Sequence, residues 1–307
     1  MAVQQGSGLQ TDKASAAAAA QSANAQPAAP PAYATICALI KDQHADVREW
    51  VAYHLAVGVD KIYLIDTGSQ VSTATVLQDY IATGVVDFSY DADIPASPGT
   101  HGPQLTAYSR CLEKGRERRG WRSSMWTSSL VIRDATADLP TLLREYEAEA
   151  GALAVNWVVF GSSGYVSKPA LNTMSSYWMC APPGHSENLH IKTIARPRRT
   201  AGVTTDPHHF KYNKPYTAIN TAREKIPGPK SERHVIDRLA LYHYAVKSEE
   251  EFNAKIARGS GMGNQKTIQF LYYVNNYTTH TCLDGIDRGM QFASFYEEDP
   301  SRKAWQT

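Results

Sequence analysis

CALIKDQHADVREWVAYHLAVGVDKIYLIDTGS, from Cys37 to Ser69, contains two strand patterns with a helix pattern between them. Its apolar, β-branched beginning belongs to the run Ala34–Lys41, which predicts a buried strand. Asp46 and Glu49 are three positions apart and form a capping-box pattern, which predicts the start of a helix. The run Lys61–Asp66 predicts a second strand that ends at a glycine-containing turn.

The alternation of strand and helix continues beyond this segment. A second helix is predicted around Tyr80, and a third strand at Val85–Tyr90. Alternation at these lengths predicts an α/β fold whose sheet is mostly parallel and flanked by helices, with right-handed crossovers. Ligands of such sheets bind beyond the carboxyl ends of the strands. Lys41, Asp42 and Asp66 lie at two such ends and are therefore the first candidate binding residues.

The remainder of the chain holds further periodic segments separated by one long irregular region. We predict helices at Pro103–Arg119, Leu139–Glu149, Glu249–Arg258 and Gln265–Tyr277, and strands at Ala152–Phe160 and Val235–Val246. Residues 161–229 are rich in His, Pro, Asn and aromatic residues and are predicted to be irregular. Loops of this length inside a compact domain are usually functional.

The charges of the chain are balanced, with 31 Lys and Arg against 30 Asp and Glu, a net charge of +1. This balance argues against a dedicated nucleic-acid-binding protein. No apolar run approaches the roughly 20 residues that a membrane helix needs, so we expect no transmembrane segment. Peripheral contact with a membrane stays open.

The first 32 residues are rich in Ala, Gln, Ser and Pro and too weakly apolar for the core of a signal peptide. A degraded targeting peptide is the alternative to a disordered tail. We expect a disordered tail over residues 1–33, one α/β domain over residues 34–280, and a C-terminal extension over residues 281–307.

The four cysteines lie far apart, without a CxxC pair, so a zinc site built on cysteine is not expected. They could form two disulfides. Cys37 lies in an apolar strand pattern and Cys111 on the apolar side of a predicted helix, so buried free thiols are favoured. Free thiols favour a reducing compartment, and the cytoplasm is therefore the expected location.

Five segments together resemble glycosyltransferase family 92 and the related family-2-like transferases. The resemblance implies a GT-A fold, a nucleotide-diphosphate sugar donor, a divalent metal (manganese or magnesium), and transfer to a glycan or another hydroxyl acceptor. The segments are Cys37–Ser69 as quoted, NWVVFGSSGY (Asn156–Tyr165), HIKTIARP (His190–Pro197), DPHHFKY (Asp206–Tyr212) and LYHYAVKSEEEFNAKIARG (Leu241–Gly259).

Candidate site residues follow from this resemblance and from position in the predicted elements. The predicted donor-binding residues are Lys41, Asp42, Asp66, Gln104 and Lys247. The predicted acceptor or pocket residues are Gly161, Ser162, Ser163, His190, Lys192 and His208. His243 lies where a late histidine completes the metal site in GT-A enzymes. Several have a structural alternative: a cap on the Gly68 turn for Asp66, a packed strand residue for His243, and a plain tight turn at residues 161–164.

The acidic metal motif that the family carries is missing. The resemblance implies a strand ending in Asp-x-Asp-Glu between Trp121 and Arg133, because hard carboxylate oxygens hold the cation that bridges the donor phosphates. Trp126 and Ser128 stand at the two Asp positions, and Ser129 stands at the Glu position. None of these side chains replaces a carboxylate as a ligand. No catalytic base can be named, although Asp206 and Asp237 have suitable chemistry.

The segment Arg122–Ser129 has a second peculiarity. Plausible codons for it, read in a frame shifted by one base, encode Ala-Phe-Ile-Asp-Val-Asp-Glu-Phe, the strand and acidic motif that the family implies. We therefore hypothesise a compensated pair of frameshifts, with a natural pseudoenzyme as the alternative.

The leading functional hypothesis is a glycosyltransferase by ancestry that is impaired as written. The alternative is a non-catalytic module that binds a nucleotide sugar or a glycan. A Rossmann-type nucleotide binder is disfavoured because no GxGxxG follows the first strand.

Overall fold

The structure is a computed structural model that describes Met1 and residues 33–94, 102–116, 120–124, 128–134 and 138–289. Nearly all of the predicted tail (residues 1–33) and part of the predicted C-terminal extension lie outside these residues. The fold described below belongs to the compact unit that begins at Ala32.

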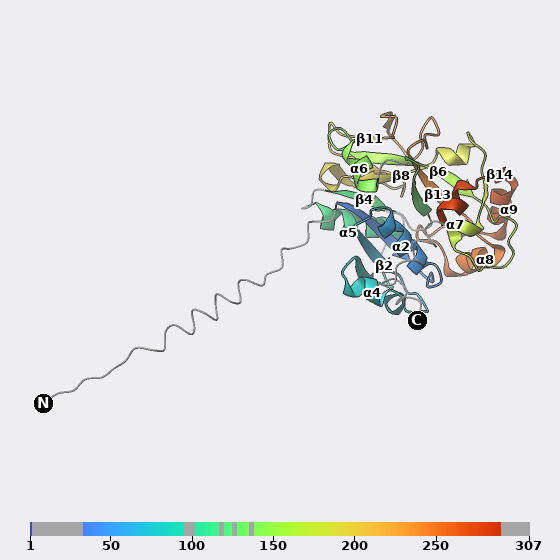
Figure 1. The fold of residues 1–307 in the computed structure, drawn as a ribbon, viewed down its shortest axis with the longest axis horizontal. Helices are drawn as coiled ribbons and strands as arrows, with labels where there is room; N and C mark the ends of the chain where they lie inside the picture. Colours follow the sequence, from blue (N-terminus) through green and yellow to red (C-terminus); the bar gives the residue numbers. More distant parts are fainter. Residues whose placement is uncertain (2–32, 95–101, 117–119, 125–127, 135–137, 290–307) are drawn as a thin grey trace. The chain divides into compact units, whose positions relative to one another are not determined.

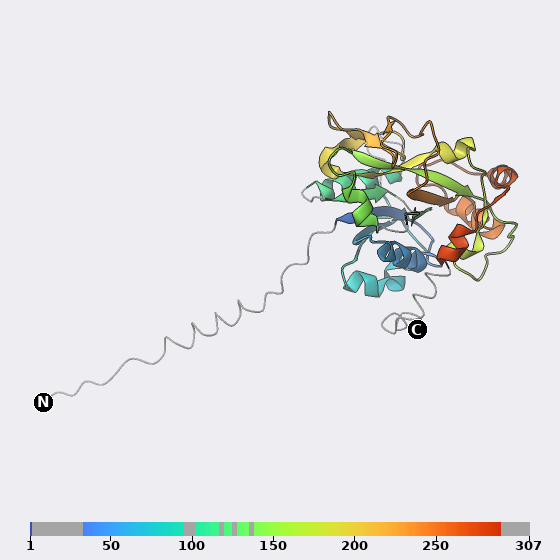
Figure 2. The ribbon, with the colours of Figure 1, turned by 45° about the horizontal axis from the view of Figure 1, so that its top comes forward.

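The first half of the main sheet is parallel, as predicted. Its four strands lie side by side in the order β3-β2-β1-β4, and every neighbouring pair runs in the same direction. Figures 1 and 2 show these strands and their helices together in one part of the unit, coloured blue to green. The strands are β1 (Ala34–Ile40), β2 (Lys61–Asp66), β3 (Val86–Tyr90) and β4 (Trp121–Ser124).

Beyond β4 the sheet is mixed. The strand β8 (Ile191–Ala195) runs antiparallel to both β4 and β6 (Ala152–Phe160). The strand β13 (Leu239–Tyr244) pairs in parallel with β6 and antiparallel with β5 (Ser128–Ile132). The predicted α/β class is therefore confirmed, whereas the prediction that residues 161–229 are irregular is wrong at β8 and at several shorter helices and strands given below. Five consecutive residues, IKTIA, suffice for that central strand.

Several short strands complete the sheets of the described residues. On the main sheet these are β7 (Met179–Cys180), β11 (Ala218–Ile219), β12 (Lys225–Ile226) and β14 (His280–Thr281). A separate two-stranded sheet consists of β9 (Thr200–Val203) and β10 (Phe210–Tyr212).

Helices cover both faces of β1. Its residues Ile36 and Ile40 belong to the same buried cluster as Val47 and Val51 of α2, whereas Cys37 packs in a second cluster with residues of α5. This split follows from the alternation of side chains along a strand. The helices are α2 (Val47–Ala56), α3 (Thr73–Val76), α4 (Gln78–Ala82), α5 (Pro103–Gly115), α6 (Leu139–Arg144), α7 (Thr173–Ser176), α8 (Glu249–Arg258) and α9 (Ile268–Tyr277), with short 3₁₀ helices η1 (Ser186–Leu189) and η2 (Pro197–Arg199).

The beginning of α8 follows the sequence rule, but that of α2 does not. Ser248 caps α8, and Glu251 completes a reciprocal capping box. Asp46 precedes α2 without capping it, because its carboxylate oxygens accept hydrogen bonds from Lys168 and Lys247. The predicted capping box at Asp46 is therefore wrong.

Both pairs of cysteines form disulfides, so the prediction of free thiols is wrong. Cys37–Cys111 joins β1 to α5, and Cys180–Cys282 joins β7 to the segment after β14, with Cα–Cα distances of 6.2 and 5.9 Å. The packing of α5 on the Cys37 face of β1 brings the first pair together, which sequence separation does not reveal. The expectation of a reducing compartment loses its basis with this correction.

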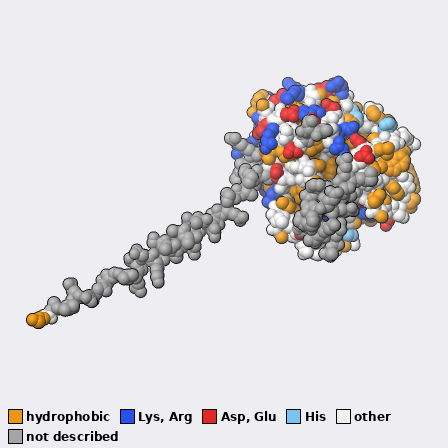
Figure 3. All heavy atoms as spheres, viewed as in Figure 1, with side chains coloured by type: hydrophobic (Ala, Val, Ile, Leu, Met, Phe, Trp, Pro, Cys, Tyr) orange, Lys and Arg blue, Asp and Glu red, His pale blue; other side chains and the backbone are white. Residues whose placement is uncertain are grey.

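The surface of the described residues carries mixed charges. On the face drawn in Figure 3, Lys and Arg alternate with Asp and Glu, while apolar side chains gather on the side where α9 lies. Tyr272 and Tyr273 of α9 are about half exposed. Within the described residues, no helix combines the length and apolar character that crossing a bilayer requires.

Candidate functional site

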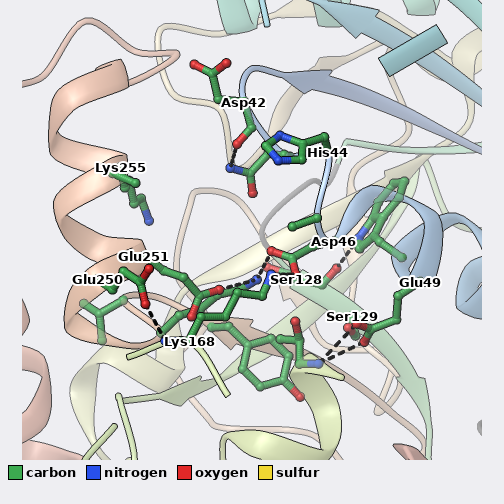
Figure 4. A pocket seen from close by; sticks show the side chains of 18 of the residues that line it. Asp42, His44, Asp46, Glu49, Ser128, Ser129, Lys168, Glu250, Glu251 and Lys255 are labelled. Carbon is green, nitrogen blue, oxygen red and sulfur yellow. Dashed lines mark hydrogen bonds and ion pairs between the residues drawn. The ribbon is translucent and has the colours of Figure 1, made fainter. Parts of the chain in front are cut away.

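A cavity of about 300 Å³ lies where the carboxyl ends of β1 and β13 meet the beginning of β5. The helix α8 forms one wall of it (Figure 4). The location agrees with the rule that ligands of α/β sheets bind at the carboxyl ends of strands. The charged lining residues are Asp42, His44, Asp46, Glu49, Lys168, Lys247, Glu250, Glu251, Lys255 and Arg258.

Asp46 is the centre of a charge network on the floor of the cavity. Its Oδ2 lies 2.8 Å from Nζ of Lys247, and its Oδ1 accepts a hydrogen bond from Nζ of Lys168. Burial alone would raise the pKa of Asp46, but the two ammonium groups outweigh burial and lower it. Asp46 is therefore ionised at neutral pH. It binds Lys168 and Lys247, two cations that lie far apart along the chain.

Glu49 lines the same cavity from the first turn of α2. Its two carboxylate oxygens accept hydrogen bonds from the backbone N–H of Thr173 at 3.1 and 3.2 Å. Burial raises the pKa of Glu49 to about 7, against the opposing effect of the Thr173 hydrogen bond. A carboxyl group with a pKa near neutrality can exchange protons at physiological pH.

Replacing Glu49 by Gln is expected to flatten the pH dependence of stability. Since the pKa is raised from 4.5 to about 7 in the folded state, the contribution of Glu49 to stability is greatest at low pH and is lost as pH rises through 7. The loss amounts to about 3 kcal/mol. Urea unfolding of the wild type and of Glu49→Gln between about pH 4.5 and pH 8 measures it. Glu113→Gln, at an exposed site on α5, is the control, and parallel curves for all three proteins would contradict the prediction.

Lys255 and Arg258 of α8 are two basic side chains that line the cavity. Nζ of Lys255 donates to the carbonyl oxygen of Ala245 at 2.8 Å. Neither side chain forms an ion pair with any residue that the structure describes. Burial lowers the pKa of Lys255 far below its usual range, and the nearby cations Lys266, Arg258 and Lys247 lower it further. Burial also lowers the pKa of Arg258, which Asp42, Asp46 and Glu251 partly offset.

Ser128 and His243 face each other across the β5–β13 pair. They are register partners, and Oγ of Ser128 lies 3.0 Å from Nδ1 of His243. Burial lowers the pKa of His243 well below its usual range, so its imidazole is neutral at physiological pH. The position where the family resemblance implies an acidic side chain is thus in direct contact with the predicted metal histidine. The metal role of His243 stays a prediction, and Trp126 lies outside the described residues.

The loops after β1 and β2 are joined by hydrogen bonds. The backbone N–H of Asp42 donates to Oγ of Ser69 at 2.8 Å, and Oδ1 of Asp42 accepts from the N–H of Gln70 at 2.8 Å. Asp42 lines the cavity, whereas the adjacent Lys41 is exposed. Asp66 is buried and accepts hydrogen bonds from the N–H groups of its own turn, as the structural alternative predicts. Its donor role stays a prediction.

Gln104 and the loop at residues 161–163, two further predictions, form contacts within the protein outside the cavity. The amide of Gln104 donates to the hydroxyl of Tyr108, one turn further along α5. In the loop after β6, the N–H of Ser162 donates to Oδ1 of Asn275, and Oγ of Ser163 accepts from the N–H groups of residues 178 and 179. Gly161 packs so closely against Thr278 that a Cβ there would lie 2.1 Å from its Oγ1. None of these four residues lines the cavity.

The predicted pocket histidines gather around Trp157 rather than in the cavity. The Trp157 ring stacks on His243 at 4.1 Å and on His190 at 4.9 Å, and His208 lies 5.0 Å away. Lys192 is close by, and burial lowers its pKa to about 7. Among the described residues, His243 links this group to the cavity, because its partner Ser128 lines the cavity. An acceptor role for these residues stays a prediction.

The cavity residues that sequence reasoning missed include Asp46, Glu49, Lys168 and Lys255. Asp46 and Glu49 follow the carboxyl end of β1, and that position could have identified them. Lys168 belongs to the loop after β6 and Lys255 to an ordinary amphipathic helix, so no local signal distinguishes them.

Comparison with known proteins gives two related sequences. The chain is 24% identical over 191 residues to a glycosyltransferase family 92 protein of Oryza sativa subsp. japonica, a match that covers 60% of this chain and 30% of that protein. It is 22% identical over 235 residues to a glycosyltransferase family 92 protein of Ricinus communis, with 73% and 37% covered. The match thus spans about a third of each relative. No family model matches the chain.

Among solved structures, the chain is similar to residues 1–349 of Staphylococcus aureus TarS. The TM-score is 0.32 and the identity 13%, with 54% of this chain and 47% of that chain covered.

Proposed function

From its relationship to glycosyltransferase family 92, we propose that this chain descends from an enzyme that transfers a sugar from a nucleotide-sugar donor to a glycan or another hydroxyl acceptor. We assign the donor to the cavity at the ends of β1 and β13. One observation carries this assignment: Asp42, Lys247 and Ser128, which come from three distant segments of the chain, line the same cavity. The sequence had marked Asp42 and Lys247 as donor residues and Ser128 as part of the motif that would hold the donor phosphates.

Glu49 is the carboxyl group best suited to accept the proton of an acceptor hydroxyl. It lines the cavity, and its pKa of about 7 is that of an effective general base at neutral pH. Asp206 lies with the His208 group outside the cavity lining, and its pKa is lowered to about 2. In this proposal Glu49 takes the proton while the sugar is transferred, and the loss of the acidic motif makes the transfer weak.

A non-catalytic binding module is the second candidate. The neutral side chains of Ser128 and Ser129 at two of the motif positions favour it. Assays of donor hydrolysis separate the two candidates, because a binding module leaves the donor intact.

Binding of a nucleotide sugar is expected to raise the melting temperature of the protein. At a ligand concentration of about one hundred times Kd the stabilisation is about 2.7 kcal/mol, which corresponds to roughly 5–10 °C for a domain of this size. A thermal-shift screen of uridine, guanosine, cytidine and adenosine diphosphate sugars measures it, with the free monosaccharides as matched controls. If no nucleotide sugar changes the melting temperature, the donor assignment is wrong.

A further inference from the structure

We propose that the cavity holds the donor diphosphate with the side chains of Lys255 and Arg258, in the place where the family resemblance implies a divalent cation. This proposal rests on the proposed function, because it concerns the same cavity and the same donor. It differs from the resemblance in the chemistry that neutralises the phosphates.

The residues present do not fit a divalent cation. Mg²⁺ and Mn²⁺ prefer carboxylate oxygens, but Ser128 and Ser129 offer neutral hydroxyls, and Oγ of Ser128 is already bonded to His243. Asp46 is occupied by two lysines, and Glu49 by the N–H of Thr173. Across the described part of the chain, no group of three or more His, Cys, Asp or Glu side chains is arranged to hold a metal ion.

The other acidic side chains of the cavity are also engaged by the protein. Oε2 of Glu250 accepts a hydrogen bond from the backbone N–H of Lys168, and Oε2 of Glu251 accepts from Oγ of Ser248. Lys247 lies 3.5 Å from the other oxygen of Glu251. The charged groups of the cavity are therefore unevenly paired. Asp46 has two lysine partners and Glu250 and Glu251 of α8 have partners of their own, whereas Lys255 and Arg258 on the same helix form no ion pair with a described residue.

Lys255 and Arg258 are three positions apart on α8, which places them on one face of the helix. Figure 4 shows Lys255 extending from α8 toward the space opposite His44 and Asp46. An ammonium group has three N–H donors. One donor of Lys255 binds the carbonyl oxygen of Ala245. The five donors of the Arg258 guanidinium have no hydrogen-bond acceptor within the described residues. Together, the planar guanidinium of Arg258 could bind a phosphate through two parallel hydrogen bonds, and the ammonium group of Lys255 would supply a compact positive charge.

The electrostatic state of this wall favours an anion. Burial lowers the pKa of Lys255, and the cations Lys266, Arg258 and Lys247 lower it further, so the ionised form of Lys255 needs an anion beside it that the free protein does not supply. A diphosphate would supply that charge in a partly desolvated space, where charge-assisted hydrogen bonds are stronger than in water. A single divalent cation at the same place would meet two positive side chains.

Calorimetric titration with uridine, guanosine, cytidine and adenosine diphosphates tests the proposal, each run once in excess EDTA and once in manganese chloride. We expect the best-bound diphosphate to have the same Kd in both buffers. We expect Lys255→Met and Arg258→Gln each to weaken it by about tenfold or more, since a hydrogen bond to a charged group contributes about 1.5–3 kcal/mol. Met fills the volume of the lysine stem, and Lys211→Ala, at an exposed site outside the cavity lining, is the matched control.

The possible results distinguish the role of Lys255 and Arg258 from the proposed binding of the donor in the cavity. Binding that requires manganese, or that manganese strengthens tenfold, overturns the role of Lys255 and Arg258 and leaves the donor cavity intact. If Lys255→Met and Arg258→Gln both bind the diphosphate with wild-type affinity, the role of these two side chains is likewise overturned. The comparison of the two buffers needs no variant and so does not depend on how the variants fold. If no diphosphate and no nucleotide sugar binds in either buffer, the proposed function fails together with the inference.

Discussion

Removal of either disulfide is expected to lower the free energy of unfolding by about 4 kcal/mol. The bridges Cys37–Cys111 and Cys180–Cys282 close loops with sequence separations of 74 and 102 residues. Cross-links over loops of this length restrict the unfolded chain strongly, and the entropy model gives about 4–5 kcal/mol for each. Since domains are stable by only about 5–15 kcal/mol, loss of both bridges is expected to unfold the protein at moderate temperature.

Denaturant unfolding of the Cys37→Ala/Cys111→Ala and Cys180→Ala/Cys282→Ala double variants measures each bridge separately. The wild type treated with a reductant should match the sum of the two losses. A reductant that leaves the wild-type midpoint unchanged, with the thiols shown to be free by alkylation, would contradict the expected contribution of the bridges.

Replacement of Arg122–Ser129 by Ala-Phe-Ile-Asp-Val-Asp-Glu-Phe is expected to produce manganese-dependent hydrolysis of the donor. Its rate should be at least about a hundredfold above that of the unmodified protein. The replacement places Asp, Asp and Glu at positions 125, 127 and 128, each one position before the motif position that the resemblance gives. Position 128, beside His243, is acidic in both alignments. Carboxylates there supply the hard ligands that the present hydroxyls lack. Release of the nucleoside diphosphate, followed with the preferred nucleotide sugar in manganese and in EDTA, measures the gain.

The buried state of Arg122 supports this replacement on structural grounds. Arg122 lies in β4 in the middle of the sheet, with its guanidinium 4.4 Å from the Tyr63 ring and Nη2 3.3 Å from the Tyr63 hydroxyl. Its Nη1 is buried without a hydrogen-bond partner among the described residues. A buried cation without a carboxylate is costly, and an apolar residue is expected at such a position.

The matched control carries Asn and Gln in place of the introduced Asp and Glu residues. It should retain the gain in stability from removing Arg122 but none of the manganese-dependent activity. Equal activity in the two replacements, or none in either although the nucleotide sugar binds, would show that the acidic motif is not what limits this chain.

The parts of the fold set by local periodicity could be predicted from the sequence. The bounds predicted for β2 and β6 are those observed, and the helix α8 begins and ends where its cap and its glycine predict. The strand β6 is a long, mostly apolar run, and β2 has a continuous apolar centre between Lys61 and Asp66, so the hydrophobic pattern decides both. The strand β8 was missed because five residues surrounded by Pro and His carry too little periodicity to distinguish a strand from a loop.

The site could be predicted only where its residues follow strand ends. Asp42, which that rule selects, and Lys247, which the resemblance selects, both line the cavity, and their donor roles stay predictions. The roles of Asp46 and Glu49 depend on Lys168, Lys247 and Thr173, which lie more than 100 residues away along the chain. Pairings at such distances are set by packing, and a single sequence does not record them. The disulfides were missed for the same reason.

The shared carboxylate of Asp46 makes three positions of this chain epistatic. Lys168 and Lys247 lie 122 and 201 residues beyond Asp46, and each donates to one of its two oxygens. Groups with a common partner do not contribute independently, so the cost of changing one lysine depends on whether the other is present. Loss of Asp46 would leave the ammonium groups of Lys168 and Lys247 without this shared carboxylate. Natural variation at these positions is therefore constrained to occur in concert, although nothing in their spacing along the chain connects them.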